Sequence, residues 1–332
     1  MKGVLAIQAD PLECLNFETD TTLMVAYAAQ RSGFKIFLYP PSQLSLSLQE
    51  GEALPAVHAR GCWVRFLGHI NEALYERSED EIFDLKGADV VWIRQNPPFD
   101  MAYLTATYLL EKLPSSVLVI NRPSGLRNCP EKIFPLQFLE FSPPTLVSRD
   151  LQEIQEFIKT HQRVVIKPLY LFGGKEIYLC DHHDDTCVPK IMHLLQKDSL
   201  PLMVQKYLPE VITEGDKRVL LLDGELLGLY QRIPQKGSFL ANMAQGSQSI
   251  KSTYTARDKA IVEALRPPLR EQGLLFVGLD IIAGYLTEIN VTSPMGLAAH
   301  NALEHKALEE RVWQKIESMI AQNSCVSWDT MR

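Results

Sequence analysis

The sequence GLDIIAGYLTEINVTSP, residues 278–294, decides how the rest of the chain is interpreted. Its branched residues and the small pair Ala283-Gly284 predict two short strands joined by a tight loop. Three oxygen-bearing side chains, Asp280, Glu288 and Asn290, stand among apolar neighbours, and the stretch contains no Lys or Arg. Carboxylate and amide oxygens are ligands that Mg²⁺ prefers, so the pattern indicates a metal site.

Metal binding at these residues sets a geometric condition. Asp280 lies opposite Glu288 only if the loop holds an odd number of residues, such as 283–285, because a two-residue turn puts Glu288 on the wrong face. Two carboxylates about 4 Å apart repel by roughly 4 kcal/mol at an effective dielectric constant near 20, so something must offset them. From this segment alone, pairing with distant Arg or Lys side chains, or exposure to water, is as well supported as a metal.

The composition bounds the class of protein. The 332 residues, 46% hydrophobic and 22% charged, are typical of a soluble globular chain with two or three structural units. The net charge of −7 and the scattered Lys and Arg residues argue against nucleic acid or a membrane surface as the main partner. No signal segment or membrane-spanning run is recognised, and the six cysteines show no Cys-x-x-Cys spacing. We therefore expect a cytoplasmic protein with reduced thiols.

The first part of the chain predicts a parallel sheet. A strand at 4–7, a helix at 21–31 after the N-cap candidate Asp20, and a strand at 35–38 form a βαβ unit. A second unit consists of a strand at 88–94, a helix at 101–112 and a strand at 117–120. Arg94 ends its strand where open α/β sheets bind ligands, although a strand-end salt bridge explains it equally well.

The second part of the chain contains several chemically suggestive segments. A short helix at 131–138 contains Lys132, and Lys167 ends an apolar strand. Gly173-Gly174 predicts a turn or, alternatively, a flap whose N–H groups cover phosphates. Asp223-Gly224 predicts a type I′ hairpin with Arg218 and Arg232 near its open end. A long loop at 233–252, a helix at 256–271 kinked or interrupted at its two prolines, and a terminal helix at 303–321 follow.

Two lysines, a Gly-Gly flap, a hairpin with arginines and a late Asp-x7-Glu-x-Asn motif together resemble the ATP-grasp superfamily. The segments 94–100, 128–134, 166–169, 215–219, 232–235 and 277–294 are, more narrowly, similar to bacterial glutathione synthetase. They occur in order and at consistent spacing, from about Asp10 to the terminal helix. A collinear set of this kind is more specific than any one motif.

The resemblance implies an α/β protein, in part α+β, with the ATP-grasp fold. An N-terminal parallel-sheet domain at 1–122 would bind substrate. Two ATP-grasp subdomains would clamp the nucleotide: a lid at 123–205 and a C-terminal subdomain with the metal site at 206–322. Residues 323–332 would form a tail. The implied activity is an ATP-dependent carboxylate–amine ligase that joins γ-glutamylcysteine to glycine through an acyl phosphate and releases ADP.

The resemblance also implies a role for each matched residue. Asp280, Glu288 and Asn290 would hold Mg²⁺, for which Mn²⁺ could substitute. Arg218 and Arg232 would be catalytic, stabilising the acyl phosphate and the developing negative charge. The ATP-binding set is Lys132, Lys167, Gly173, Gly174, Gln205, Tyr207, Leu208 and Asp216. Asp20, Arg94 and Ser293 would bind the ends of the dipeptide. The implied partners are therefore the small molecules ATP, γ-glutamylcysteine and glycine, and relatives of this family are commonly homo-oligomeric.

Two departures from the family pattern keep alternatives open. The run Tyr170-Leu171-Phe172-Gly173-Gly174 replaces the usual Asp-Gly-x-Gly-Gly, and Gln248 stands where the second lid typically has an Arg. If that Arg contacts substrate or phosphate, losing its charge-assisted bond costs on the order of 1.5–3 kcal/mol in affinity or in activation free energy, unless Lys236 or Lys251 compensates. Another ATP-grasp ligase with a changed acceptor and a non-catalytic nucleotide-binding relative are the alternatives. The intact metal triad and both lysines favour an enzyme.

Overall fold

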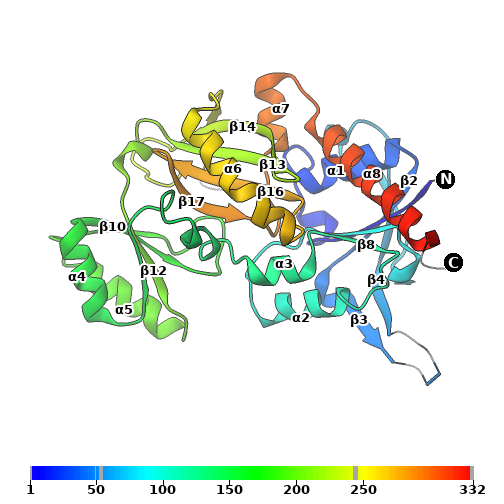
Figure 1. Ribbon diagram of the computed structural model, residues 1–332, viewed down its shortest axis with the longest axis horizontal. Helices are drawn as coiled ribbons and strands as arrows, with labels where there is room; N and C mark the ends of the chain where they lie inside the picture. The colour runs from blue at the N-terminus through cyan, green and yellow to red at the C-terminus, as the bar shows by residue number, and fades with distance from the viewer. Residues whose placement is uncertain (1, 49, 52–54, 242–245, 330–332) are drawn as a thin grey trace.

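The computed structural model describes residues 2–48, 50–51, 55–241 and 246–329, with side chains described at all of these except 71 and 324–329. Three β-sheets follow one another along the chain and helices cover them (Figure 1). The helices are α1 (Thr21–Arg31), α2 (Met101–Leu110), α3 (Pro123–Asn128), α4 (Leu151–His161), α5 (Cys187–Lys197), α6 (Ala256–Glu271), α7 (Leu297–Glu304) and α8 (Leu308–Asp329). The predicted α/β class is confirmed.

The N-terminal sheet has the parallel core that the sequence predicts. Its strand order is β3-β4-β2-β1-β7-β8, with β5 and β6 also paired to β4. Pairing is parallel between β1 (Gly3–Gln8), β2 (Phe34–Tyr39), β7 (Val90–Ile93) and β8 (Leu118–Ile120). The less regular region forms the antiparallel strands β3 (Leu44–Ser47), β4 (Ala56–Phe66), β5 (Tyr75–Arg77) and β6 (Glu81–Asp84). Asp20 caps α1 by accepting bonds from the N–H groups of Thr22 and Leu23.

The second sheet, called the lid sheet here, forms the end of the molecule farthest from the N-terminus (Figure 1). Its antiparallel order is β11 (Tyr178–Asp181), β10 (Arg163–Pro168), β12 (Leu202–Lys206) and β9 (Thr145–Ser148). Helices α4 and α5 cover it through a core that includes Ile154, Val164 and Ile191. The predicted helix at 131–138 is wrong. Only a 3-10 turn, Phe134–Gln137, forms there, because Pro135 supplies no N–H for an α-helical bond.

The third sheet, the central sheet, is antiparallel and lies between the other two (Figure 1). Its order is β15 (Gln248–Ile250), β14 (Glu225–Ile233), β13 (Asp216–Leu222), β16 (Phe276–Ile282) and β17 (Tyr285–Asn290). Positive φ angles of 54° at Asp223 and 71° at Gly224 confirm the predicted hairpin turn between β13 and β14. Helix α6 packs on this sheet and continues through Pro267 and Pro268 without interruption.

The β16–β17 hairpin places Asp280 opposite Glu288, as metal binding requires, but in a way that the sequence did not indicate. Its turn holds two residues, Ala283 and Gly284, at φ 50° and 75°, so the predicted odd-numbered loop is wrong. A β-bulge at Thr287 supplies the extra residue instead, and Asp280 pairs directly with Glu288. The Thr287 hydroxyl donates to the Asp280 carbonyl oxygen at 3.1 Å across the bulge.

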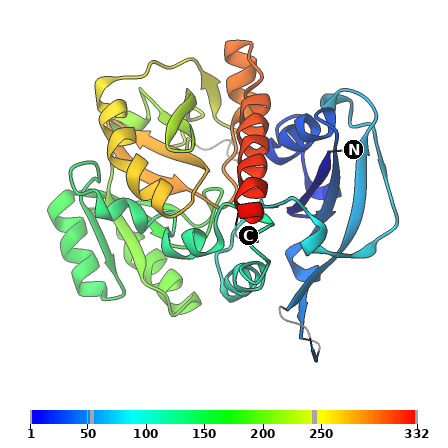
Figure 2. The same ribbon diagram turned by 45° about the vertical axis from the view of Figure 1, so that its right-hand side comes forward.

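The C-terminal helix ties the first and third sheets into one body. Figure 2 shows α8, in red, standing between the N-terminal sheet and the central sheet. Trp313 on α8 is completely buried, and its ring meets Phe34 edge-on at 4.8 Å in a cluster that also includes Leu220 and Phe276. The helix continues to Asp329, past the boundary at 322 predicted for the tail. None of the described helices is long and apolar enough to cross a membrane.

Candidate active site

A pocket lies between the lid sheet and the central sheet and collects many of the predicted nucleotide-binding and metal-binding residues. It is a cleft open to solvent. The predicted residues that line it are Lys167, Gln205, Tyr207, Leu208, Asp216, Asp280 and Glu288. Apolar side chains, including Val211, Phe239 and Ile282, pack around Tyr207. The cleft therefore joins an apolar slot, suited to a flat ring, to a charged end.

Two lysines stand at the charged end of the cleft. The Lys132 ammonium lies 3.1 Å from Glu288 Oε1 and is almost completely buried. Lys167 Nζ donates to Gln205 Oε1 at 2.9 Å, across the β10–β12 pair. Burial lowers the pKa of Lys167, and the Glu288 carboxylate opposes that shift. A ligand with negative charges would stabilise the Lys167 ammonium above all, because no carboxylate lies at salt-bridge distance from it among the described residues, whereas Lys132 already contacts Glu288.

Asp280 sits between two buried arginines. Arg218 forms a two-pronged contact with it, Nε to Oδ1 at 2.7 Å and Nη2 to Oδ2 at 3.2 Å, and Arg232 Nη2 lies 2.9 Å from Oδ1. Burial alone raises the pKa of Asp280, but the two guanidinium groups outweigh it and the pKa falls below its usual value. These arginines come from β13 and β14, far from the acidic hairpin in sequence. Asp280 is therefore ionised and held in a fixed orientation.

Asp216 shares Arg232 with Asp280. Arg232 Nη2 donates to Asp216 Oδ2, and the two acids raise the pKa of Arg232 although burial acts to lower it. For Asp216 the balance is opposite, because burial raises its pKa to about 6 despite Arg232. Its other oxygen, Oδ1, is buried and accepts no hydrogen bond within the described part of the chain. That oxygen is available to a ligand of the cleft.

The donor set fits a magnesium ion. The β16–β17 register puts Asp280 and Glu288 opposite each other, and Asn290 follows two residues along the same strand. Asn290 uses its Nδ2 to donate to the Gly278 carbonyl oxygen at 3.3 Å, which leaves its Oδ1 for another partner. No group of three or more His, Cys, Asp or Glu side chains suited to a metal occurs among the described residues. Mg²⁺ commonly takes one or two carboxylates and completes its shell with water and substrate phosphates, which matches this set.

A second cluster gathers the residues predicted to bind the dipeptide. Arg94 is buried and donates to Thr22 Oγ1 and to the Pro294 carbonyl oxygen, both at 3.0 Å. Burial lowers its pKa to about 10, opposed by the Asp20 carboxylate, so the guanidinium keeps its charge at neutral pH. Ser293 Oγ donates to Asn96 Oδ1 at 2.6 Å. The structure thus brings Asp20, Arg94 and Ser293 into one neighbourhood, with Asp20 also serving as the α1 cap.

The two glycines predicted to bind ATP lie elsewhere, and so does Gln248, the residue that departs from the family pattern in the second lid. Gly173 and Gly174 belong to the flap between β10 and β11, at φ 69° and 76°, and are not among the residues that line the cleft. Gln248 is exposed on the edge strand β15, paired in register with Ile233. Part of the predicted long loop, residues 242–245, lies outside the described residues.

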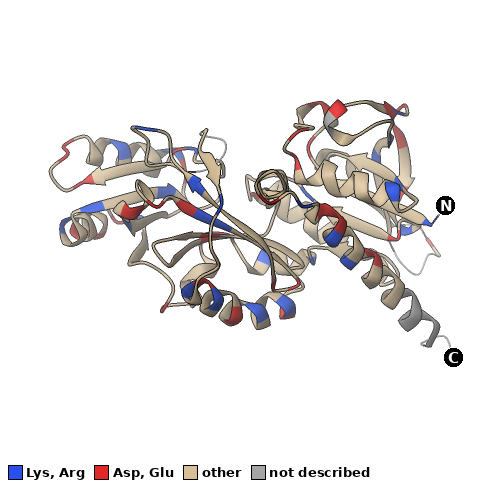
Figure 3. Cartoon of the chain, turned by 90° about the horizontal axis from the view of Figure 1, so that it is seen from above, with Lys and Arg blue, Asp and Glu red and all other residues tan. Residues whose placement is uncertain are grey.

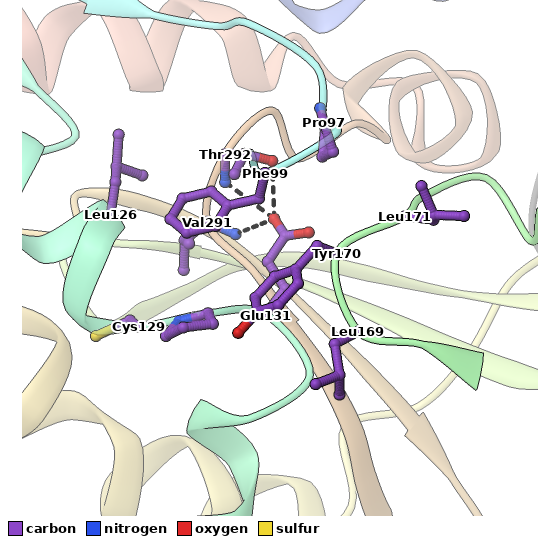
Figure 4. Close-up of a pocket in the computed structure, with 11 residues that line it drawn as sticks. Pro97, Phe99, Leu126, Cys129, Glu131, Leu169, Tyr170, Leu171, Val291 and Thr292 are labelled. Atoms are coloured by element: carbon purple, nitrogen blue, oxygen red, sulfur yellow. Dashed lines mark hydrogen bonds between the residues drawn. The ribbon is translucent and has the colours of Figure 1, made fainter. Parts of the chain in front are cut away.

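Glu131 is a site residue that the sequence analysis missed. Its Oε1 accepts hydrogen bonds from Val291 N, Thr292 N and Thr292 Oγ1 at 2.8–3.0 Å, and its backbone oxygen accepts from Ile289 N (Figure 4). Burial, and next the Glu288 charge, raise the pKa of Glu131. Glu131 fixes the chain between Asn290 and Ser293. In the sequence, only its position next to Lys132 pointed to a role for Glu131, because its hydrogen-bond partners lie about 160 residues later in the chain.

The fold and this cleft, with acids on a central hairpin and lysines from the lid side, define an ATP-grasp protein. A family model described as the ATP-grasp domain of prokaryotic glutathione synthetase matches residues 131–305, and one for the N-terminal domain of the same proteins matches residues 4–127. The chain belongs to the prokaryotic glutathione synthetase family. The resemblance found in the sequence and the expected ATP-grasp fold are both confirmed.

Individual relatives agree. The chain is 38% identical over 314 residues to a glutathione synthetase of Rhodopseudomonas palustris, covering 95% of this chain and 98% of that one. It is also 38% identical over 324 residues to a glutathione synthetase of Bradyrhizobium diazoefficiens, covering 97% and 100%. Among solved structures, a D-cycloserine synthetase is similar with a TM-score of 0.67 at 14% identity, covering 96% of this chain and 100% of that one. At that identity the likeness concerns the fold alone.

Proposed function

We propose that this chain is an enzyme that uses ATP to join γ-glutamylcysteine to glycine, giving glutathione, ADP and phosphate. The observation that carries the proposal is the family membership over nearly the whole chain, together with the cleft that gathers Lys167, Asp216, Asp280 and Glu288. A cytoplasmic location is part of the proposal, since the five cysteines with described side chains are free thiols, as in a reducing compartment.

The residues of the cleft suit the first half of this reaction. The apolar slot beside Tyr207 and Leu208 would hold adenine, with Lys132 and Lys167 neutralising the phosphates as point charges. Asp280, Glu288 and Asn290 would hold Mg²⁺, and the ion would supply a Lewis acid that offsets negative charge on the phosphates. The dipeptide carboxylate would take the γ-phosphoryl group, so a bond forms between its oxygen and phosphorus while the bond to the ADP oxygen breaks.

The second half of the reaction needs positioning and charge stabilisation. Arg94, Ser293 and Asp20 would orient the dipeptide from the N-terminal domain. The glycine nitrogen would attack the acyl carbon and phosphate would leave, while Arg218 and Arg232 stabilise the negative charge. Both arginines are rigidly held by Asp280 and Asp216, which reduces the reorganisation they need. We also propose the division into a substrate domain at 1–122, a lid at 123–205 and a C-terminal subdomain at 206–322.

Product analysis tests the proposed function. Purified protein would be incubated with ATP, Mg²⁺, γ-glutamylcysteine and glycine, and the tripeptide measured by mass spectrometry. We expect glutathione and an equal amount of ADP. A parallel panel in which alanine, serine or β-alanine replaces glycine distinguishes a ligase with a different acceptor. Preferred incorporation of another amine, or ATP binding without any ligated product, would contradict the proposal.

A further inference from the structure

The flap, defined here as residues 169–175 between β10 and β11, is docked on the N-terminal domain through Tyr170. The Tyr170 ring is stacked on the Phe99 ring, with 6.0 Å between centroids and 26° between planes. The Phe99 N–H donates to the Tyr170 carbonyl oxygen at 3.2 Å. Phe99 in turn contacts the completely buried Tyr103, at 4.9 Å. Figure 4 shows Tyr170 reaching from the flap toward Phe99, beside Glu131.

The same flap is held from the nucleotide side. Lys132 Nζ donates to the Leu171 carbonyl oxygen at 2.6 Å, next to Tyr170 in the chain, and also contacts Glu288 at 3.1 Å. Lys132 and Glu288 are the groups proposed to meet ATP phosphates and Mg²⁺. A change at either of them therefore acts on the backbone of the flap within one residue of the aromatic contact.

The loop that Tyr170 contacts is the one that supports the dipeptide residues. This substrate loop, residues 95–100, joins β7 to α2 directly after Arg94. Its Asn96 accepts from Ser293 Oγ and donates to Asp10 Oδ2 at 2.7 Å. Its Asp100 caps α2 by accepting from Tyr103 N at 2.9 Å. The loop is thus fixed at both ends, and the flap contact lies between them.

We propose that Tyr170 couples the two substrate sites, so that bound nucleotide strengthens the binding of γ-glutamylcysteine. Tyr170 is a positioning residue, and this inference rests on the proposed function. Nucleotide held at Lys132 and Glu288 favours the docked flap, and the docked flap holds Phe99 and the substrate loop in place. The dipeptide then binds a loop that is already ordered, and linkage requires it to strengthen nucleotide binding by the same factor.

Binding calorimetry tests the coupling directly. The dissociation constant of γ-glutamylcysteine would be measured with and without Mg²⁺ and the non-hydrolysable analogue AMPPNP, and that of AMPPNP with and without the dipeptide. We expect both affinities of the wild type to rise by the same factor, at least about fivefold. Tyr170→Ala should reduce that factor to below about twofold while changing dipeptide affinity without nucleotide by less than about twofold. Tyr170→Phe keeps the ring and should keep the factor.

A matched control and a parallel assay separate the outcomes. Tyr108→Ala removes a half-exposed ring from α2 whose partner is Arg127, and it should leave the factor unchanged. Glutathione formation by the same preparations decides the proposed function independently. A wild type that makes glutathione but shows no coupling would overturn the inference alone, as would full coupling in Tyr170→Ala. A wild type that neither ligates nor binds the dipeptide would overturn both.

Discussion

At the scale of single residues, Arg232 holds two buried carboxylates at once, Asp216 and Asp280. We expect Arg232→Ala to lower kcat by about 10²–10³, because the donor proposed to stabilise the developing negative charge is lost. It should also lower the free energy of unfolding by about 3–5 kcal/mol, because the buried Asp216 loses its guanidinium partner while Asp280 keeps only Arg218. Steady-state kinetics and urea denaturation measure the two effects. Arg266→Ala, which removes a partly exposed guanidinium paired with Glu225, is the control, and equal losses in both variants would contradict this assignment.

Glu131 offers a second test at this scale. Replacing it with Ala removes the acceptor for three donors on Val291 and Thr292, and each donor left buried without a partner costs about 1–3 kcal/mol. We expect a clear loss of unfolding free energy together with a lower kcat, since Asn290 and Ser293 flank the released segment. Glu131→Gln keeps one acceptor oxygen and should recover most of the stability. Wild-type denaturation midpoints in Glu131→Ala would exclude the proposed bracing role.

Residue types and spacing predicted the composition of the site well but not its partners. The sequence pointed to Asp280, Arg218 and Arg232 separately. Arg218 and Arg232 precede Asp280 by 62 and 48 residues, and their side chains meet its carboxylate only after β13, β14 and β16 pair in one sheet. Of the interpretations left open for Asp280, pairing with distant arginines is the one seen. Metal binding is compatible with it, because the two carboxylate oxygens offer about four lone-pair sites and the arginines make three contacts with them.

At the scale of elements, α7 contains a buried titratable group, His300. Its ring packs on β14, where a Cβ added at Gly228 would lie 2.7 Å from it, and its Nδ1 is buried without a hydrogen bond among the described residues. Burial lowers the pKa of His300, and the Lys306 charge adds to this while Glu304 opposes it. The folded protein therefore binds a proton at His300 less readily than the unfolded chain does.

The sign of the pH effect follows from that shift. Where the unfolded chain binds more protons, the free energy of unfolding rises with pH, so His300 stabilises the fold above pH about 6.5 and less as the pH falls below that value. We expect His300→Asn to flatten the dependence of the unfolding free energy on pH between about 7 and 5. Urea denaturation at several pH values measures it. Parallel curves for the two proteins would show that His300 does not contribute.

The turn between β16 and β17 shows why elements are predicted more easily than their register. Strand pattern and the small pair Ala283-Gly284 located the hairpin, and side-chain alternation correctly required one extra residue. Nothing local marked Thr287 as that residue, because a bulge is selected by packing and cross-strand bonding rather than by propensity. Residues 131–138 differ, because the signal there is local: Pro135 supplies no N–H for an α-helical bond, and only a 3-10 helix forms.

At the scale of the whole molecule, stability depends on α8, which packs against two sheets. Trp313→Ala should lower the free energy of unfolding by about 3–5 kcal/mol, because a completely buried ring leaves a cavity. Leu139→Ala, at a side chain that is 84% exposed, should change it by less than about 0.5 kcal/mol. Guanidinium denaturation compares the two. A small effect at Trp313 would mean that α8 is not an integral part of the shared core.

Charge placement at this scale is even, with Lys and Arg interspersed among Asp and Glu along the chain (Figure 3). Because charge is spread so evenly, it carried no information about the architecture. The architecture was predicted from the order and spacing of the motifs. What the sequence could not predict is how the domains join. The Asn121 side chain, for example, accepts hydrogen bonds from Leu275 N and Phe276 N and donates to the carbonyl oxygens of Phe276 and Val291. Such contacts depend on which surfaces meet after each sheet has formed.

The most direct test of the central claim is phosphate release by purified protein supplied with ATP and Mg²⁺. The measurement would be made with and without γ-glutamylcysteine and glycine, beside Glu288→Ala and the surface control Glu76→Ala. We expect steady release only when both co-substrates are present, wild-type rates in Glu76→Ala, and a loss of at least about 10²-fold in Glu288→Ala. Release that is independent of the dipeptide, or that continues unchanged in Glu288→Ala, would contradict a ligase built around the acidic hairpin.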